Sequence, residues 1–359
     1  MYDLVIKGAE VADGTGAPLR TADVAVKDGR ISEVGKLNGG AKESVDGDGL
    51  VLAPGIVDVH THYDAQLTWD SNATPSPSMG VTTVVVGNCG FSIAPCPPDC
   101  RDLIARNLAE VEGMSLTALR SGTNWDFESF DEYLALLRRK GVTPNVAAFI
   151  GHSAVRTMVM GPEASERAAR EDEVAEMRDL VRGGIDAGAI GFSTSTSINH
   201  YGDGGVPMPS RLAEESEMRS LVGVLGEKGR GVFQLTVGPS MTSEVMESLA
   251  HDNNCPVFQT AALYNEAFPE RAPQMVSDSA AAQARGNQLW AQVSCQSLSM
   301  DFALTAAFPM QSLDSWRPLI NVDNESFERQ IREAEFRRRF RHDLDVPQKG
   351  KLFFGDWSN

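Results

Sequence analysis

Apolar and polar positions follow two different patterns along the chain. In the first pattern, near the N-terminus, short runs of mainly apolar residues are separated by turn residues. They predict β-strands at Tyr2–Lys7, Asp23–Val26 and Arg30–Val34. The dipeptide Asp28-Gly29 predicts a type I′ hairpin between the last two runs, because glycine tolerates the positive φ that this turn requires. We therefore predict a small β domain over residues 1–55.

The second pattern alternates apolar runs with amphipathic segments. The apolar runs predict strands at Ile56–Val59, Thr82–Val86, Asn145–Ile150, Ala189–Phe192, Gly231–Val237, Pro256–Leu263 and Gln288–Val293. Between several of them, apolar residues at helical spacing predict helices, for example after the acidic start Glu171–Glu173 and after the capping pair Ser129 and Glu132. Nearly continuous apolar strands between amphipathic helices are typical of a parallel sheet covered by helices.

Seven such strands are one fewer than a closed (β/α)8 barrel contains. The remaining candidate, Leu352–Phe354, is short and lies beside the C-terminus. We predict an α/β fold of the TIM-barrel type over residues 56–359, in which either one strand escapes the count or the barrel is incomplete at its C-terminal end.

Composition narrows the classes of function. The chain has 359 residues, 42% of them hydrophobic and 23% charged, which is typical of a globular protein with a core. With 32 Lys+Arg against 49 Asp+Glu the net charge is −17, so nucleic acid and anionic membrane surfaces are disfavoured as partners. No apolar run approaches the roughly 18 residues of a membrane span. Five cysteines and no visible signal peptide predict a cytoplasmic protein without a disulfide framework.

The first predicted strand of the barrel ends in two histidines. Residues two apart on a strand point to the same face, so His60 and His62 project together from its carboxyl end, where barrel active sites are built. Paired imidazoles are a natural half of a zinc site, and Asp58 on the same side could orient one of them. Two hydrogen-bonded histidines without a metal are an equally good interpretation of this motif alone.

The second predicted strand runs directly into a cysteine between glycines. A thiolate at Cys89, again at the carboxyl end of a strand, would bring the ligands to three, the number that a catalytic zinc typically takes from the protein. The alternative is a small buried thiol, which is common in protein cores.

Together these motifs resemble the amidohydrolase superfamily, and within it the N-acyl-D-amino-acid deacylase (D-aminoacylase) branch. The resemblance rests on Gly-x-x-Asp-x-His-x-His after a small β domain, on Gly-Asn-Cys-Gly, and on the segments Gly151–Arg156 and Ala189–Thr194. It implies a TIM barrel that carries a small β-sandwich domain built from both chain ends. It also implies His60, His62 and Cys89 as metal ligands, one Zn²⁺ per chain, and hydrolysis of a small-molecule amide bond other than a peptide bond by zinc-activated water.

Two departures from the family pattern stand out. The family has further histidine ligands on strands five and six, whereas Phe233–Val237 and Phe258–Ala261 contain no histidine. The Ser-Asp-x-Gly-x-His segment that carries the family's proton-shuttle aspartate is absent, Asp356 does not fit it, and the catalytic residue stays unassigned. We therefore expect this chain to be shorter than a full family member. It would then form homo-oligomers, need a complementing C-terminal chain or be inactive alone.

Four residues at or after the third and fourth strands are candidates for substrate binding: His152, Ser193, Tyr201 and Arg211. Arg211 could hold a substrate carboxylate in a bidentate pair, or it could be an ordinary residue at a helix start. His152 could bind substrate or metal, or it could equally be structural, and Tyr201 could belong to an exposed loop. The substrate class that the resemblance favours is N-acyl-D-amino acids. The alternative is another small amide or a cyclic imide, although no lysine lies at the end of a predicted barrel strand, unlike in the superfamily members that open cyclic amides.

Overall fold

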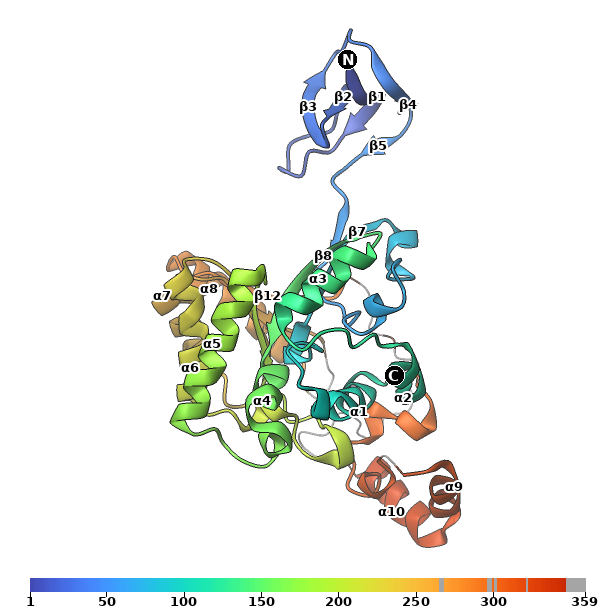
Figure 1. Cartoon of the computed structure of the whole chain (residues 1–359), viewed down its shortest axis with the longest axis vertical. Helices are drawn as coiled ribbons and strands as arrows, with labels where there is room; N and C mark the ends of the chain where they lie inside the picture. The colour runs from blue at the N-terminus through green and yellow to red at the C-terminus, as the bar shows by residue number, and fades with distance from the viewer. Residues whose placement is uncertain (265–267, 296–298, 300–301, 321, 347–359) are drawn as a thin grey trace. The chain divides into compact units, whose positions relative to one another are not determined.

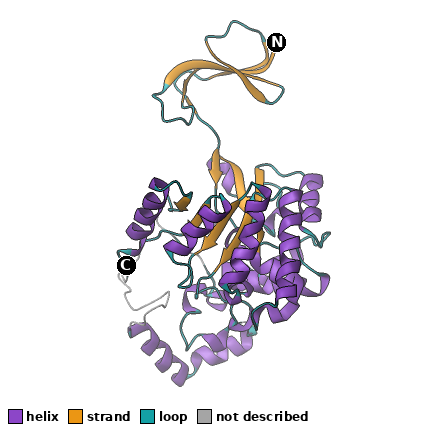
Figure 2. Cartoon of the chain, turned by 90° about the vertical axis from the view of Figure 1, so that its left-hand side faces the viewer, coloured by secondary structure: helices purple, strands orange, loops and turns teal. Residues whose placement is uncertain are grey.

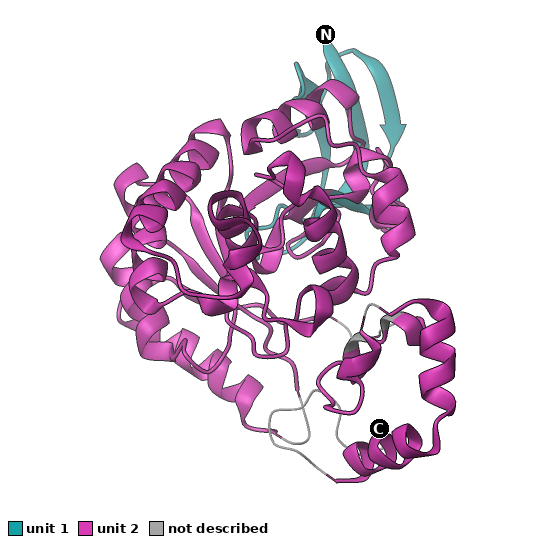
Figure 3. Cartoon of the chain, turned by 60° about the horizontal axis from the view of Figure 1, so that its bottom comes forward, with its two compact units in different colours: residues 1–57, 80–82 teal, residues 58–79, 83–359 magenta. Residues whose placement is uncertain are grey.

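The computed structural model describes residues 1–264, 268–295, 299, 302–320 and 322–346. The chain divides into two units, coloured separately in Figure 3. Unit 1 comprises Met1–Val57 and Gly80–Thr82, and unit 2 comprises Asp58–Met79 and Thr83–Asn359. The predicted strand Leu352–Phe354 and the unassigned Asp356 lie outside the described residues.

Unit 1 is built on one mixed sheet of five strands. The strands are β1 (Tyr2–Val11), β2 (Arg20–Lys27), β3 (Arg30–Gly35), β4 (Ala41–Asp46) and β5 (Val51–Leu52). Their order is β3-β2-β1-β4, and β5 also pairs with β1. The pairs β1–β2 and β2–β3 are antiparallel, whereas β4 and β5 run parallel to β1. The described part of this unit is a single sheet, so the second layer of the β-sandwich stays a prediction.

The hairpin between β2 and β3 has the predicted turn. Asp28 and Gly29 both have positive φ, 52° and 72°, and Lys27 pairs with Arg30 across them. Positive φ at both central residues is the signature of a type I′ turn, whose twist matches that of the strands it joins. The carboxylate of Asp3 accepts the Asp28 N–H at 2.7 Å and holds the turn against β1.

The main sheet contains all seven predicted strands. They are β6 (Ile56–Asp58), β7 (Val81–Val86), β8 (Asn145–Gly151), β9 (Gly191–Ser195), β10 (Val232–Thr236), β11 (Val257–Thr260) and β12 (Leu289–Ala291). They lie in chain order from β6 to β12, and each pair from β7 to β12 is parallel. The predicted α/β architecture is confirmed. Within the described residues the sheet ends at β6 on one side and at β12 on the other, and a closed barrel is not formed.

Most helices of unit 2 pack on this sheet or beside it (Figures 1 and 2). They are α1 (Arg101–Glu112), α2 (Leu116–Gly122), α3 (Phe130–Lys140), α4 (His152–Met160), α5 (Glu171–Ala187), α6 (Glu215–Lys228), α7 (Ser243–Asn253) and α8 (Arg271–Ala284). The predicted capping box is present, because the Ser129 hydroxyl accepts the Glu132 N–H at 3.2 Å and the Glu132 carboxylate accepts the Ser129 N–H at 3.0 Å. It fixes the start of α3.

The core lies between the sheet and these helices. Phe192 on β9 and Phe233 on β10 are fully buried and stack with their ring centroids 5.9 Å apart. From the helix side, α5 buries the apolar stripe predicted for it, which includes Met177, Val181 and Ile185. Each such side chain contributes about 1.5–3 kcal/mol when fully buried, so this burial holds the helices on the sheet.

The last described helices, α9 (Asn324–Arg332) and α10 (Ala334–Asp345), pack around Trp316 in a cluster of their own. Its buried members are Ala307, Leu313, Trp316, Leu319, Phe327 and Leu344. All five cysteines are described, and none forms a disulfide. Among the described helices, none combines the length and the apolar character needed to cross a bilayer.

Candidate metal centre

The two histidines follow β6 and point to a common side. Thr61 between them is buried, and both its N–H and its hydroxyl donate to the Val85 carbonyl of β7, at 3.0 and 2.7 Å. This pairing keeps the segment extended beyond β6. In an extended chain, side chains two residues apart point to the same face, so His60 and His62 lie on one face and Thr61 on the other. Their ring centroids are 5.3 Å apart.

Cys89 reaches the same place through a left-handed turn after β7. The short 3₁₀ turn η3 (Asn88–Gly90) has φ of 57° at Cys89, between Gly87 at 76° and Gly90 at 79°. Gly87 has no substitute here, because a Cβ would lie 2.3 Å from the Phe149 carbonyl oxygen. Three left-handed residues within four turn the chain sharply enough to aim the thiol back over the sheet end.

Hydrogen bonds from three other segments hold this turn. The Cys89 N–H donates to Gln234 Oε1 at 2.8 Å, the Gly90 N–H to Ser193 Oγ at 3.0 Å, and the Gly87 N–H to Asp64 Oδ2 at 3.0 Å. Because these acceptors lie on or near different strands, the position of the thiol depends on the whole end of the sheet.

The three side chains converge closely enough to share an ion. Cys89 Sγ lies 3.2 Å from His60 Nε2 and 3.8 Å from His62 Nε2, and one ligand atom from each residue lies within 4.8 Å of the others. A tetrahedral zinc, with Zn–S near 2.3 Å and Zn–N near 2.05 Å, sets sulfur and nitrogen ligands about 3.6 Å apart. The observed separations lie on either side of this value, so the geometry fits zinc.

The electrostatics of the cluster also fit a cation. Burial raises the pKa of the Cys89 thiol to about 12 and that of the Asp64 carboxyl to about 7. Burial, with the neighbouring His60 and His200, holds the pKa of His62 well below its usual value. A divalent ion among them would favour the thiolate and bind the neutral imidazole, which are the forms that coordinate metals.

Gln292 orients the first histidine. Its Oε1 lies 3.0 Å from His60 Nδ1, which leaves Nε2 facing the sulfur of Cys89. The sequence had suggested Asp58 for this role, and the structure corrects it: Asp58 Oδ1 accepts the backbone N–H of His60 at 3.4 Å. Gln292 directly follows β12, so this side-chain contact links the segments that follow the first and last strands of the sheet, which is curled but open.

Replacing Gln292 with alanine is expected to weaken metal binding by about 10- to 100-fold, the usual effect of losing a group that orients a histidine ligand. Chelator competition with the purified protein measures this change. Gln288→Ala, at the opposite end of β12, is the matched control and should bind like the wild type. Equal affinity in the Gln292 variant would show that His60 needs no such partner.

Two of the predicted substrate-binding residues are buried and engaged by the protein itself. His152 is fully buried, with Nδ1 2.8 Å from Thr194 Oγ1 and Nε2 2.7 Å from Glu217 Oε1. Burial lowers the pKa of His152, while Glu217 opposes this shift. Ser193 is also fully buried; it accepts the Gly90 N–H and donates to the Gly87 carbonyl. These placements favour structural roles.

Tyr201 and Arg211 form a second polar group with a residue that sequence reasoning missed. The guanidinium carbon of Arg211 lies 4.9 Å from the centre of the Tyr201 ring, and that of Arg317 lies 5.5 Å from it. Arg317 also donates to the Tyr201 hydroxyl at 3.3 Å, and Arg211 Nη1 donates to the His200 carbonyl at 3.0 Å. Two cations beside one phenol make this group suitable for an anion.

Aromatic contacts connect this group to the cluster. The Phe91 ring lies 6.2 Å from the ring of His62 and 5.1 Å from that of His200, centroid to centroid. Burial, with the charge of Arg211, lowers the pKa of His200 to about 3, and its Nδ1 lies 2.7 Å from Ser195 Oγ. His200 is therefore a neutral side chain between the two polar groups.

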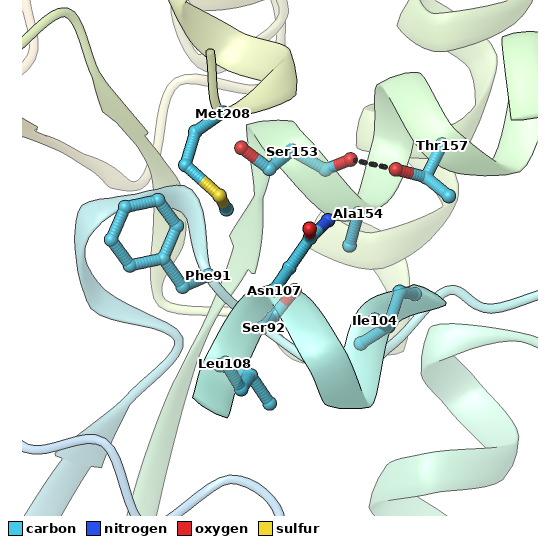
Figure 4. Close-up of a pocket in the computed structure, with 9 residues that line it drawn as sticks. All are labelled: Phe91, Ser92, Ile104, Asn107, Leu108, Ser153, Ala154, Thr157 and Met208. Atoms are coloured by element: carbon cyan, nitrogen blue, oxygen red, sulfur yellow. Dashed lines mark hydrogen bonds between the residues drawn. The ribbon is translucent and has the colours of Figure 1, made fainter. Parts of the chain in front are cut away.

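Phe91 also lines a small cavity (Figure 4). The lining residues are Phe91, Ser92, Ile104, Asn107, Leu108, Ser153, Ala154, Thr157 and Met208. The Thr157 hydroxyl donates to the Ser153 carbonyl at 2.8 Å, so this polar pair is satisfied within α4. The cavity thus offers a mainly apolar surface that shares Phe91 with the candidate metal centre.

Strands β10 and β11 lack the histidine ligands of the family, and their polar side chains hydrogen-bond to the cysteine turn and to each other. Gln234 on β10 accepts the Cys89 N–H, and its Nε2 donates to Thr260 Oγ1 on β11 at 3.1 Å. These two side chains brace the cysteine turn. Sequence reasoning missed the role of Gln234, although this residue lies on a predicted strand.

Comparisons with known proteins agree with this geometry. A model of the amidohydrolase family matches residues 43–332. The chain is 41% identical to a D-aminoacylase of Alcaligenes xylosoxydans xylosoxydans over 198 residues, which is 54% of this chain and 37% of that protein. The aligned segment thus spans less than half of that relative.

Two solved structures share the fold at appreciable identity. One is a D-aminoacylase described as defining a novel subset of amidohydrolases, with a TM-score of 0.66 and 31% identity over 80% of this chain and 57% of that one. The other is an N-acyl-D-glutamate deacylase from Bordetella bronchiseptica complexed with zinc and a phosphonate inhibitor, with a TM-score of 0.64 and 28% identity over the same shares. The predicted resemblance is confirmed: with a family model matched over most of its length, this chain belongs to the amidohydrolase family.

Proposed function

We propose that the protein is a zinc-dependent hydrolase that removes the acyl group from N-acyl-D-amino acids. The observation that carries the proposal is the convergence of His60, His62 and Cys89 at the carboxyl end of a parallel sheet. The similarity to a D-aminoacylase, and to an N-acyl-D-glutamate deacylase with bound zinc, supports this choice of substrate and metal.

Zinc at this site would supply a Lewis acid for the acyl carbonyl and lower the pKa of a bound water. The chain's own residues provide the setting. Gln292 holds His60 in one orientation, while Gln234 and Ser193 fix the turn that carries Cys89. The residue that transfers the proton stays unassigned among the described residues.

The group of Tyr201, Arg211 and Arg317 is proposed to receive the substrate carboxylate. An N-acyl amino acid carries this charge close to its amide bond, and His200 and Phe91 link the arginine group to the candidate metal centre. Although burial lowers the pKa of Arg211, a guanidinium remains charged at neutral pH and can form two hydrogen bonds to a carboxylate.

Parallel assays test the proposal. Protein purified without chelators should contain about one zinc per chain and should hydrolyse N-acetyl-D-amino acids faster than their L-isomers or cyclic imides. Turnover of cyclic imides alone would assign the site to that alternative substrate class. Metal-free protein that takes up no zinc would contradict the proposal.

Replacing Arg211 with methionine is expected to lower kcat/KM for N-acyl-D-amino acids by about 10- to 100-fold, since a charge-assisted hydrogen-bonded contact contributes roughly 1.5–3 kcal/mol. Most of the change should appear in KM. The corresponding amino-acid amides, which lack the carboxylate, provide the control and should lose little. An equal loss for both substrates would assign Arg211 to the fold.

We further propose that a strand between β12 and β6 closes an eight-stranded barrel, supplied by a complementing chain or by a second copy of this one, and that the enzyme acts in the cytoplasm. The open order of the described strands supports the first point. Size-exclusion chromatography with light scattering tests it, because a monodisperse monomer would argue against association.

A further inference from the structure

Phe91 separates the candidate metal centre from the apolar cavity described above. The residue directly follows the cysteine turn and is only 2% exposed. Its ring centroid lies 6.2 Å from that of His62 and 5.1 Å from that of His200. The same ring lines the cavity, with Ile104 of α1 and Ala154 of α4 at the opposite side (Figure 4). Phe91 is therefore a wall that the metal centre and the cavity share.

The cavity is small and suits an apolar guest. Its volume is about 20 Å³, roughly the space of one water molecule. Hydroxyls on its wall donate to acceptors within the protein: Ser92 to the Ala94 carbonyl at 2.7 Å, and Ser153 to the Ser210 hydroxyl at 3.1 Å. A buried water needs two to four polar partners, and these groups are already engaged. The cavity thus offers space for methyl or methylene groups rather than for water.

The proposed reaction brings an apolar chain to this wall. The acyl carbonyl carbon must reach the candidate metal centre, while the substrate carboxylate is proposed to reach Tyr201, Arg211 and Arg317. The acyl chain is bonded to the reacting carbon, so its first atoms must lie beside the histidine rings, where Phe91 is a neighbouring apolar side chain. Protein interiors are close-packed, so a longer chain could enter only by displacing the buried ring together with its neighbours.

We propose that Phe91 determines the acyl specificity of the enzyme: by closing the cavity between α1 and α4, it restricts the substrate to short acyl groups. The inference rests on the proposed function and adds the property of the substrate that the site selects. With a smaller side chain at this position, the cavity and the vacated ring volume become one apolar space that is continuous with the acyl site. Longer acyl chains then gain burial that the wild type denies them.

The acyl-chain preference of the zinc-loaded full chain tests the proposal. The N-acetyl, N-butanoyl and N-hexanoyl derivatives of one D-amino acid are compared by kcat/KM, and the wild type should hydrolyse the acetyl derivative best. Each methylene that becomes buried is worth about 4-fold, and the space of the lost ring takes about two or three of them. Phe91→Ala should therefore raise the ratio of hexanoyl to acetyl kcat/KM by about 15- to 60-fold over the wild type.

Two further variants distinguish this role from a general loss of packing. Ala154 lines the cavity from α4, so adding Ala154→Leu to Phe91→Ala refills the space and should return the preference to the acetyl derivative. Phe130→Ala is the matched control. Phe130 is similarly buried, at 4% exposed, but it lies on α3, outside the cavity lining, and its ring is 6.4 Å from that of Tyr133. This variant should keep the wild-type ratio.

The outcomes separate the two proposals. An unchanged ratio in Phe91→Ala overturns the role of Phe91 while the proposed function stands. The same holds for a gain seen only when the side chain of an N-acetyl substrate grows from D-alanine to D-leucine, because Phe91 would then contact the other end of the substrate. A wild type that hydrolyses none of these compounds overturns both. Should Phe91→Ala not fold, Phe91→Leu decides: a gain of about 4-fold, the value of one methylene, supports the role, and no gain overturns it.

Discussion

Cys89→Ser is expected to weaken Zn²⁺ binding by well over about 100-fold and to abolish hydrolysis of N-acyl-D-amino acids at limiting metal. Losing a group that only orients a metal ligand typically lowers metal affinity by about 10- to 100-fold. The thiolate is a direct donor in the proposed site, so its loss should cost more. A serine hydroxyl does not ionise near neutral pH, so it cannot replace that donor. Elemental analysis and chelator competition measure the change.

Cys255→Ser is the control for this variant. Cys255 is another buried cysteine, 3% exposed, and it lies between α7 and β11, outside the three-residue cluster. The control should bind zinc like the wild type despite a small loss of stability. Undiminished zinc content in the Cys89 variant would remove the main support for the proposed function.

Glu217→Ala is expected to lower the free energy of unfolding by about 3–5 kcal/mol, because it leaves a buried guanidinium without its partner. Arg156 is fully buried, and its Nη1 donates to both oxygens of Glu217, at 2.7 and 2.5 Å. The same carboxylate lies 2.7 Å from His152. Urea denaturation, followed by tryptophan fluorescence, measures the loss.

Glu215→Ala on the same helix is the control. Its carboxylate is 54% exposed and pairs with Arg219 at 2.7 Å. An exposed pair contributes at most about 1 kcal/mol, so this change should be small. Similar effects for the two substitutions would mean that the buried network adds nothing beyond surface pairing.

The effect of Glu217 should depend on pH. Burial alone would raise the pKa of this carboxyl, but His152 and Arg156 outweigh it and hold the value at about 2, against an ordinary 4.5. A lowered carboxyl pKa stabilises the fold fully above pH 4.5, and this contribution disappears as the pH falls toward 2. The difference between wild type and Glu217→Ala should therefore narrow over that interval, and a constant difference would contradict the network.

The elements predicted well are those with local signals. The seven strands follow from apolar runs of strand length, and the pairing of His60 with His62 follows from the two-residue period of a strand. Cys89 was found because its glycine neighbours mark a sharp turn at a strand end. In each case the controlling information lies within a few residues of the site.

The missed residues depend on distant partners. Gln292 is 232 positions from His60, and only the curl of the sheet brings them together. Ser193 accepts the Gly90 N–H because β9 approaches the cysteine turn, a contact that the sequence does not indicate, and its contact with substrate stays a prediction.

The left-handed backbone at Cys89 has a consequence for which metal ion the site prefers. Among residues with side chains, aspartate and asparagine adopt positive φ most readily, so Asp in place of Cys89 would preserve the turn while exchanging sulfur for oxygen. Oxygen donors suit harder ions such as Mn²⁺, whereas thiolates select zinc. The turn thus sets the position of the donor atom, and the side chain at residue 89 sets its chemical type. A single substitution at this position would change the preferred metal while the turn keeps its shape.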